Sequence, residues 1–260
     1  MAAAESAQES AGTYVYGIFP GDIELADDQT GVGDPPGQVR VVHSGDLAAL
    51  VSDVDPDHAL GTPDDLTAHK RILDDSAAEV PVLPLRFGAV LASEDAVANE
   101  LLAAHHDEFA SALDELEGKA EYVVKGRYVE NIILAEVLSE NKQAMQLAER
   151  IRSASPDATR DARIELGELI SNAITAKREQ DTRELGDRMD GHCVASLVRE
   201  PTHERDAVHV AFLIDTEAGQ DKDLEEAIDE LAGTWEGRID LRVLGPMAAY
   251  DFVGTADAGT

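Results

Sequence analysis

The stretch VHVAFLID, residues 208–215, decides the fold of the second half of the chain. This apolar run of β-branched and aromatic residues predicts a buried strand. Residues 221–235 follow with a helical pattern, and residues 239–244 predict another strand. Residues 193–199 predict a strand on the other side of the central run. The four segments together form a strand–strand–helix–strand unit.

A further strand and a long helical region precede this unit. Residues 121–128 predict the strand, and residues 135–189 predict helix. Ser155-Pro156-Asp157 divides this region into two helices, because proline disfavours helix in the residue before it and can open the next helix. The result is the βαββαβ order of a ferredoxin-like unit with an enlarged first crossover. We therefore expect a C-terminal ferredoxin-like α+β domain over residues 119–254, with a helical insertion at residues 135–190.

The first half of the chain predicts a separate α+β domain over residues 13–118. Thr62-Pro63-Asp64-Asp65 combines a capping residue, an initial proline and acidic residues, which opens a helix that runs to about residue 79. A continuous amphipathic helix is expected from Ser93 to Gly118. The expected strands cover residues 14–19, 39–43, 47–51 and 80–87. The fold class is therefore α+β, with two domains of ferredoxin-like sheets and packed helices; residues 1–12 are expected to be a disordered tail, and residues 255–260 a second tail.

The charge balance is extreme, with 53 acidic and 21 basic residues and a formal net charge of −32. Such a surface repels phosphate backbones and anionic lipids, so neither nucleic acid nor a lipid membrane is an expected partner. The single cysteine, Cys193, excludes an internal disulfide and suits a reducing compartment. No apolar stretch approaches the roughly 20 residues that a bilayer-spanning helix requires. We expect a soluble, cytoplasmic protein.

The motifs of catalysis are missing from the sequence. Gly31-Val32-Gly33 is followed by Asp34-Pro35-Pro36 rather than by a helix, so it fails as a phosphate-binding loop. No Gly-x-Ser-x-Gly elbow occurs, and His192-Cys193 lacks the second ligand pair of a zinc site. We predict no catalytic residue, no cofactor and no metal, and hence no enzyme.

Two segments contain residues that are costly or constrained. Residues 82–88 place Arg86 in an apolar strand, where its guanidinium must reach solvent or pair with an acid. An ion pair that fixes a helix against the sheet is the favoured interpretation. Residues 245–253 follow the last strand with a turn and aromatic residues, and are expected to fold back and close the core.

An apolar stripe lies in the least acidic part of the chain. Residues 133–191 hold 12 acidic and 9 basic side chains, whereas residues 1–69 hold 13 acidic and one basic. Packing within its own domain is one interpretation of the stripe, and a docking face for a partner helix is the other. The stripe consists of Leu166, Leu169, Ile170, Ala173 and Ile174.

Four short motifs occur in order along the chain. Residues 14–18 read Tyr-x-Tyr-Gly-Ile, and Leu116-Glu117-Gly118 with Glu121 and Lys125 reads Leu-x-Gly-x-x-Glu-x-x-x-Lys. The other two are Leu-Pro-x-Arg-Phe-Gly, with Leu83, Pro84, Arg86, Phe87 and Gly88, and the closing Gly-Pro-x-x-x-Tyr-x-Phe-Val, with Gly245, Pro246, Tyr250 and Phe252. These motifs resemble the signatures of the GvpF/GvpL family of gas vesicle proteins. Met247-Ala248-Ala249 stands where members often have Trp-Pro-Pro, which leaves the F or L subtype open.

The resemblance implies an accessory protein of gas vesicle formation that binds the small hydrophobic shell protein GvpA and other accessory Gvp proteins. It would prevent aggregation of GvpA or help nucleation, in the cytoplasm or as a minor component of the gas vesicle. Its candidate binding surfaces are the stripe and the exposed side of the first domain's sheet. The alternative is a small-molecule-binding enzyme or sensor on a ferredoxin-like sheet.

Overall fold

The computed structural model describes residues 12–25, 29–55, 60–155 and 157–253. The chain forms two compact units, one of residues 1–121 together with 246–260 and the other of residues 122–245. The expected tails at residues 1–11 and 255–260 lie outside the described residues. Gly12, assigned to the first tail, is instead the first residue of a strand.

Unit 1 contains an antiparallel sheet in the order β2-β3-β1-β4, with β5 also paired to β1. Its strands are β1 (Gly12–Pro20), β2 (Arg40–Ser44), β3 (Leu47–Val54), β4 (Leu83–Pro84) and β5 (Val90–Leu91). The strand predicted at residues 80–87 is therefore reduced to two residues. Pro81 and Pro84 have no N–H to donate to a ladder, which limits pairing in this segment.

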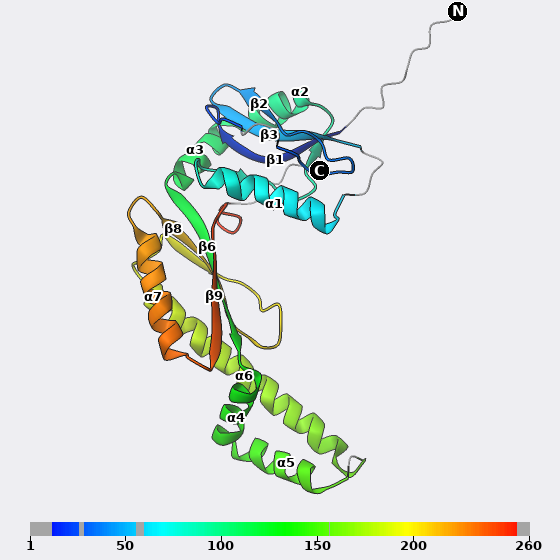
Figure 1. Ribbon diagram of the computed structural model, residues 1–260, viewed down its shortest axis with the longest axis vertical. Coiled ribbons are helices and arrows are strands. Elements are labelled where there is room, and N and C mark those ends of the chain that lie inside the picture. Colours follow the sequence, from blue (N-terminus) through cyan, green and yellow to red (C-terminus); the bar gives the residue numbers. More distant parts are fainter. Residues whose placement is uncertain (1–11, 26–28, 56–59, 156, 254–260) are drawn as a thin grey trace, which may run out of the picture. The chain divides into compact units, whose positions relative to one another are not determined.

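Helices pack against both faces of this sheet. Every residue of β1 from Gly12 to Phe19 is buried, and β3 is buried at all but one position. Helix α1 (Pro63–Ala77) contacts β1, while α3 (His106–Leu116) and the π-helix η1 (Val97–Leu102) contact β1 and β3 (Figure 1). The exposed sheet side that we expected as a binding surface is therefore not present in the described residues.

The prediction of one continuous helix over residues 93–118 is wrong for the central part of this range. The chain forms α2 (Glu94–Ala96), then η1, then a turn, and begins again as α3. Ala103 N–H donates to the carbonyl of Ala98, five residues earlier, which is the π-helical pattern. The wider turn accompanies burial of both Leu101 and Leu102, two adjacent residues that a regular helical pattern does not place on one face.

Unit 2 contains the four-stranded sheet in the order β7-β8-β6-β9, which confirms the βαββαβ prediction. The first crossover holds three α-helices where two were expected. Asn141 accounts for the extra break, because its side chain caps the next helix by accepting from the N–H groups of Gln143 and Ala144. The elements are β6 (Lys119–Tyr128), α4 (Glu130–Glu140), α5 (Lys142–Ser153), η2 (Asp157–Thr159), α6 (Arg160–Met189), β7 (Ala195–Val198), β8 (Asp206–Asp215), α7 (Gln220–Thr234) and β9 (Ile239–Met247).

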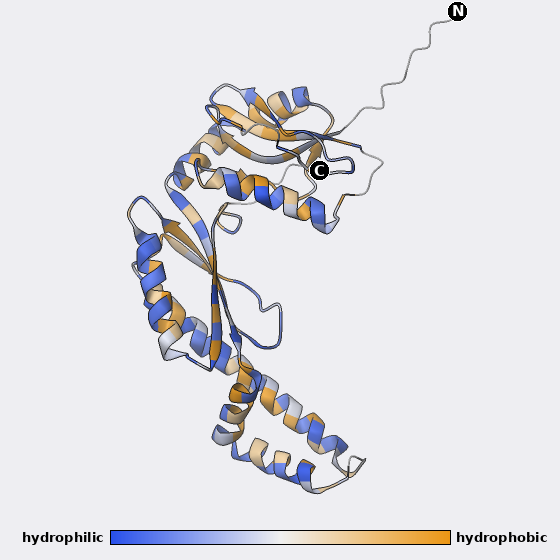
Figure 2. Cartoon of the chain, in the orientation of Figure 1, coloured by the Kyte–Doolittle hydropathy of each residue, from blue (hydrophilic) through white to orange (hydrophobic). Residues whose placement is uncertain are grey.

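The long helix α6 divides its length between two environments. Leu185 and Met189, near its carboxyl end, belong to the core that α6, α7 and the sheet enclose. The amino-terminal half extends past the sheet and is accompanied by α4 and α5 (Figure 1). We call α4, α5 and this half of α6 the helical arm. Figure 2 shows apolar residues spread along the arm among hydrophilic ones.

The closing segment lies in unit 1, although we had assigned residues up to 254 to the second domain. Met247, Ala248 and Ala249 are buried. The backbone N–H of Ala248 donates to the carboxylate of Asp74 on α1 at 3.3 Å, and that of Asp251 donates to Glu121 at 2.9 Å. Backbone groups that find acceptors in unit 1 hold the segment there.

Asp65 fixes the start of α1 to the loop before it. Its carboxylate accepts hydrogen bonds from the backbone N–H groups of Gly33 at 2.8 Å, Gly61 at 3.1 Å and Thr62 at 3.0 Å. The Thr62 hydroxyl in turn accepts from the Asp65 N–H, which completes a capping box. The hydrogen bond from Gly33, with those from Thr62 and Gly61, lowers the pKa of Asp65 to about 2.

We expect Asp65→Asn to lower the free energy of unfolding by about 2 kcal/mol at neutral pH. The folded state favours the carboxylate, so this stabilisation is present above pH 3.8 and is lost as the pH falls toward about 2. Urea denaturation of both proteins across this range measures the effect. Asp64→Asn, an exposed neighbour in the same turn, is the control and should change stability by less than about 0.5 kcal/mol. If the difference in the free energy of unfolding between Asp65→Asn and the native chain stayed constant with pH, the role of the Asp65 charge would be contradicted.

Candidate functional site

The signature residues Phe87 and Gly88 belong to an aromatic cluster in the core of unit 1. The Phe87 ring lies 5.9 Å from Tyr14 and 5.5 Å from His69, centroid to centroid. The N–H of Gly88 donates to the Tyr14 hydroxyl at 3.1 Å, and that hydroxyl lies 2.8 Å from Nδ1 of His69. Burial lowers the pKa of His69 to about 4, so the ring is neutral at physiological pH. These contacts give Phe87 and Gly88 a structural role.

The two signature segments meet at a small pocket of about 130 Å³. Leu83 and Pro84 reach it from β4, where they pair with Ile18 and Gly17 of β1. Tyr250 reaches it from the closing segment. The remaining lining residues are Ile18, Leu85, Arg86, Glu108, Phe109, Ala112 and Val253. Two motifs that lie far apart in sequence therefore share one packing site.

Arg86 lines the same pocket, and its side chain is exposed, as is that of Glu108. Arg86 does not lie in the strand expected over residues 80–87, because β4 ends at Pro84. The ion pair that is the favoured interpretation of Arg86 stays a prediction.

Among the signature residues of the closing motif, Tyr250 is half-buried beside Asp74. Burial raises the pKa of this phenol, and the neighbouring carboxylate of Asp74 raises it further. The Tyr250 hydroxyl makes no hydrogen bond of normal geometry within the described part of the chain. Phe252 is half-buried, whereas Gly245 and Pro246 are exposed near the end of β9. Gly245 has a φ of 139°, which favours glycine.

The apolar stripe lies on the arm half of α6, and the structure divides it. Leu166, Leu169, Ile170 and Ala173 are all half-buried, and α5 packs along the same helix. Only Ile170 of these four lines an open groove in unit 2. Ile174, one turn further along, lines it as well.

The groove has a volume of about 450 Å³ and runs between α4, α6 and the loop before β8. Its apolar walls come from Ile133 and Leu134 on α4 and from Ile170 and Ile174 on α6. Gly167 leaves space on α6, because its position carries no side chain. Apolar walls beside polar lining residues suit the nonpolar side chains of a partner segment. The rest of the lining consists of Glu130, Ser171, Thr175, Arg178 and residues 201–205.

Hydrogen bonds hold the loop that forms the rim. Arg178 donates to the carbonyl of Asp206 at 2.6 Å and to that of Glu204 at 2.8 Å. Arg205 pairs with Glu130 on α4 at 3.1 Å. These contacts join α6, α4 and the loop, so the groove is bounded on three sides by linked elements. No motif in the sequence marks this loop as part of a site.

A partly buried network of charges anchors the arm to the sheet. Asp181 on α6 is almost completely buried and accepts from the Tyr128 hydroxyl at 2.5 Å and from Arg238 at 3.0 Å. Arg238 also donates to Glu136 on α4 at 2.9 Å, and Lys177 on α6 pairs with Glu136 at 2.6 Å. Burial opposes the charge on Arg238, but its hydrogen bonds to Asp181 and Glu136 outweigh this and raise its pKa.

Other reactive residues are dispersed. Within the described ranges, no group of three or more histidine, cysteine, aspartate or glutamate side chains could hold a metal ion. Burial raises the pKa of the Cys193 thiol. His192 contacts Asp223 at 3.2 Å. No helix in the described part of the chain is long and apolar enough to span a bilayer.

The fold and the groove define a two-unit α+β protein with an apolar groove on a helical arm. The profile of the family described as gas vesicle synthesis protein GvpL/GvpF matches residues 12–254. The chain belongs to this family, as the resemblance of the short motifs predicted, and its function is related to gas vesicles.

The similarity to known proteins extends over almost the whole length of the chain. Gas vesicle protein F of Streptomyces sp. (strain CB03234) is 33% identical over 93% of this chain and 99% of its own. Gas vesicle protein L of the same organism is 26% identical over 94% and 93%. The crystal structure of the gas vesicle protein GvpF from Anabaena sp. PCC7120 has a TM-score of 0.74, with 22% identity over 94% of this chain and 98% of that one. These relatives are named as gas vesicle proteins rather than as enzymes, which does not favour the alternative of a small-molecule enzyme.

We predict that the anchoring network contributes to the stability of unit 2. Asp181→Asn should lower the free energy of unfolding by about 3 kcal/mol, because it leaves the buried side of Arg238 without its carboxylate. Urea denaturation measures this loss. Glu230→Gln is the matched control, since it removes the partner of Arg188 in an exposed pair and should cost less than about 1 kcal/mol. Equal effects of the two substitutions would show that burial of the network contributes nothing.

Proposed function

We propose that this chain assists gas vesicle formation by binding the small hydrophobic shell protein GvpA through the groove of the helical arm. The observation that supports this is an open apolar groove in a protein of net charge −32. Ile133 and Leu134 form the α4 wall of the groove, and Ile170 and Ile174 form its α6 wall. Apolar side chains from a partner can therefore contact two facing helices at once.

The charge of the chain suits a carrier of an aggregation-prone subunit. A shell protein that presents apolar surface to water associates nonspecifically unless that surface is covered. A very acidic protein that covers it would keep the complex soluble by mutual repulsion between complexes. The carrier would prevent aggregation of GvpA or help to nucleate the gas vesicle shell. It would act in the cytoplasm at the growing gas vesicle.

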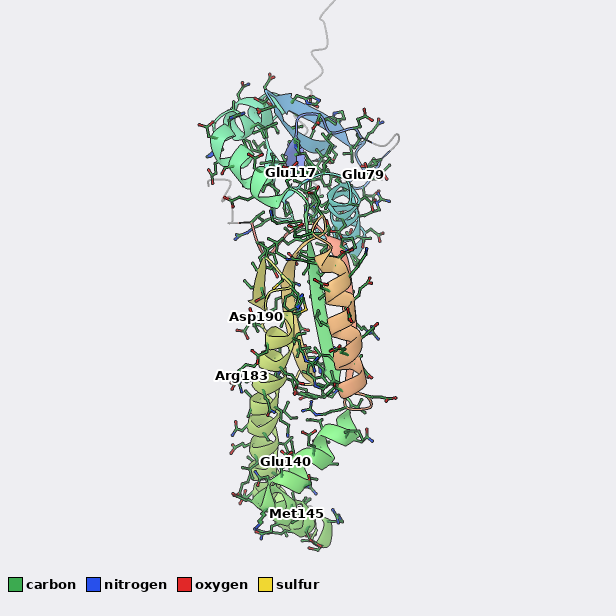
Figure 3. All side chains as sticks on the ribbon, turned by 90° about the vertical axis from the view of Figure 1, so that its left-hand side faces the viewer. Glu79, Glu117, Glu140, Met145, Arg183 and Asp190 are labelled. Carbon is green, nitrogen blue, oxygen red and sulfur yellow. The ribbon has the colours of Figure 1, made fainter. Side chains whose placement is uncertain are left out.

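The arm also presents isolated apolar side chains outside the groove. Figure 3 labels Met145 near the end of the arm. Met145 on α5 is 49% exposed, and Ile164 on α6 is 55% exposed. Neither lines the groove. They therefore provide a comparison between apolar surface in general and the groove in particular.

We expect Ile170→Asp to weaken GvpA capture by at least about tenfold, because it places a charge among the apolar groove walls. Ile164→Asp, on the same helix but outside the groove, should change capture by less than about twofold. Capture on immobilised GvpA measures both, and circular dichroism checks that each variant is folded. If the Ile170→Asp variant is folded and still captures GvpA as well as the native chain does, the groove is not the binding site.

GvpA capture should also survive high salt. Attraction between exposed charges is screened beyond about 8 Å at physiological ionic strength and over shorter distances in molar salt. Burial of apolar surface contributes roughly 25 cal/mol per Å² and needs no opposite charges, so kosmotropic salt should maintain or strengthen it. Capture is measured from low to molar sodium sulfate. A steep loss of capture would overturn the apolar mechanism.

A further inference from the structure

The pocket of about 130 Å³ in unit 1 has apolar inner walls. Its buried lining residues are Ile18, Leu83, Leu85 and Phe109, none of them more than 7% exposed. Walls of this kind offer a water molecule too few hydrogen-bond partners to hold it. An apolar cavity of about 150 Å³ lined by leucine, isoleucine and phenylalanine stays dry and binds benzene. The size and the walls of the pocket therefore suit a small hydrocarbon.

The polar residues that line the pocket already have contacts of their own. Glu108 contacts His105 at 3.5 Å, and Arg86 also has an interaction within the chain. The hydroxyl of Tyr250 lies beside the carboxylate of Asp74. A charged ligand would lose its water on entering the pocket and gain no unengaged charge in return. The lining therefore favours an uncharged ligand.

The walls come from segments that lie far apart in the sequence. Leu83 belongs to β4, Ala112 to α3, and Val253 to the closing segment. The closing segment is held on unit 1 by the backbone N–H groups of Ala248 and Asp251, which donate at 3.3 and 2.9 Å. A molecule in the pocket would add apolar contacts between this segment and the rest of unit 1. Filling the pocket and holding the segment are thus linked.

We propose that this pocket binds a small uncharged apolar molecule, about the size of one aromatic ring, whose presence holds the closing segment on unit 1. Burial of the ring against Ile18, Leu83 and Phe109 supplies the affinity. The closing segment then opens only after the ligand has left. The site lies in unit 1, whereas the groove proposed for GvpA lies in unit 2, so each proposal can fail without the other.

Benzene is the probe, and methyl NMR of the full chain is the measurement. The methyl resonances of Ile18, Leu83 and Val253 should shift as benzene is added, with a Kd on the order of 1 mM. Benzoate, its charged match, should bind at least about tenfold more weakly. Unchanged resonances at about 10 mM benzene would overturn the proposal. Shifts confined to Ile170 and Ile174 would place benzene in the groove of unit 2 and overturn it as well.

Substitutions at Ala112 fill the pocket from α3. Ala112→Leu should weaken benzene binding by at least about tenfold, because the larger side chain occupies the space that the ring needs. Ala112→Val adds fewer atoms and should have an intermediate effect, and it replaces the leucine variant if the methyl spectrum shows that the latter is unfolded.

The matched control is Ala110→Leu. Ala110 is also half-buried on α3 but does not line the pocket, so this variant should bind benzene within about twofold of the native chain. Equal affinities of folded Ala112 and Ala110 variants for benzene would show that the ring does not occupy the pocket, and the proposal would be wrong.

Hydrogen exchange tests the link to the closing segment. Saturating benzene should slow exchange of the Ala248 and Asp251 amide hydrogens by at least about threefold, because the segment opens only from the ligand-free state. Exchange is measured by NMR on the native chain and on Ala112→Leu, in which benzene should have no effect. If benzene binds the native chain without slowing this exchange, the ligand does not hold the closing segment.

Discussion

The carboxylate of Asp181 is the interaction on which the arrangement of unit 2 depends. It accepts hydrogen bonds from the Tyr128 hydroxyl at the end of β6 and from the Arg238 guanidinium in the turn before β9. Arg238 continues to Glu136 on α4. A buried charge is tolerated only when its partners are in place, so this one group requires sheet, α6 and α4 to meet in a single geometry. The groove exists because that geometry holds α4 beside α6.

The distribution of charge leaves the walls of the groove in unit 2 apolar. These walls come from Ile133 and Leu134 on α4 and from Ile170 and Ile174 on α6. Charges that line the groove are already used in contacts such as Arg205 with Glu130. A protein of net charge −32 thus keeps one surface suited to apolar partners.

Local patterns allowed much of the fold to be predicted, since they report burial and capping directly. The capping box at Thr62 and the strand order of unit 2 are examples. The stripe on α6 was located, but only Ile170 and Ile174 reach the groove, because the register of α5 against α6 is a property of packing. Asp181 and Arg238 are 57 residues apart, and no local signal predicts their contact. The strand expected over residues 80–87 is reduced to Leu83–Pro84, because Pro81 and Pro84 cannot donate to a ladder, and Arg86 beyond it is exposed.

Residues 246–253 belong to unit 1 but are synthesised after all of unit 2. Unit 1 takes its backbone partners for Ala248 and Asp251 from residues made much earlier, at Asp74 and Glu121. All of unit 2 lies between them in the sequence. The ribosome therefore releases the part that completes unit 1 only after unit 2 has been translated. Throughout that interval the nascent first unit lacks the Tyr250 side of its pocket, so the apolar lining is not covered from that side.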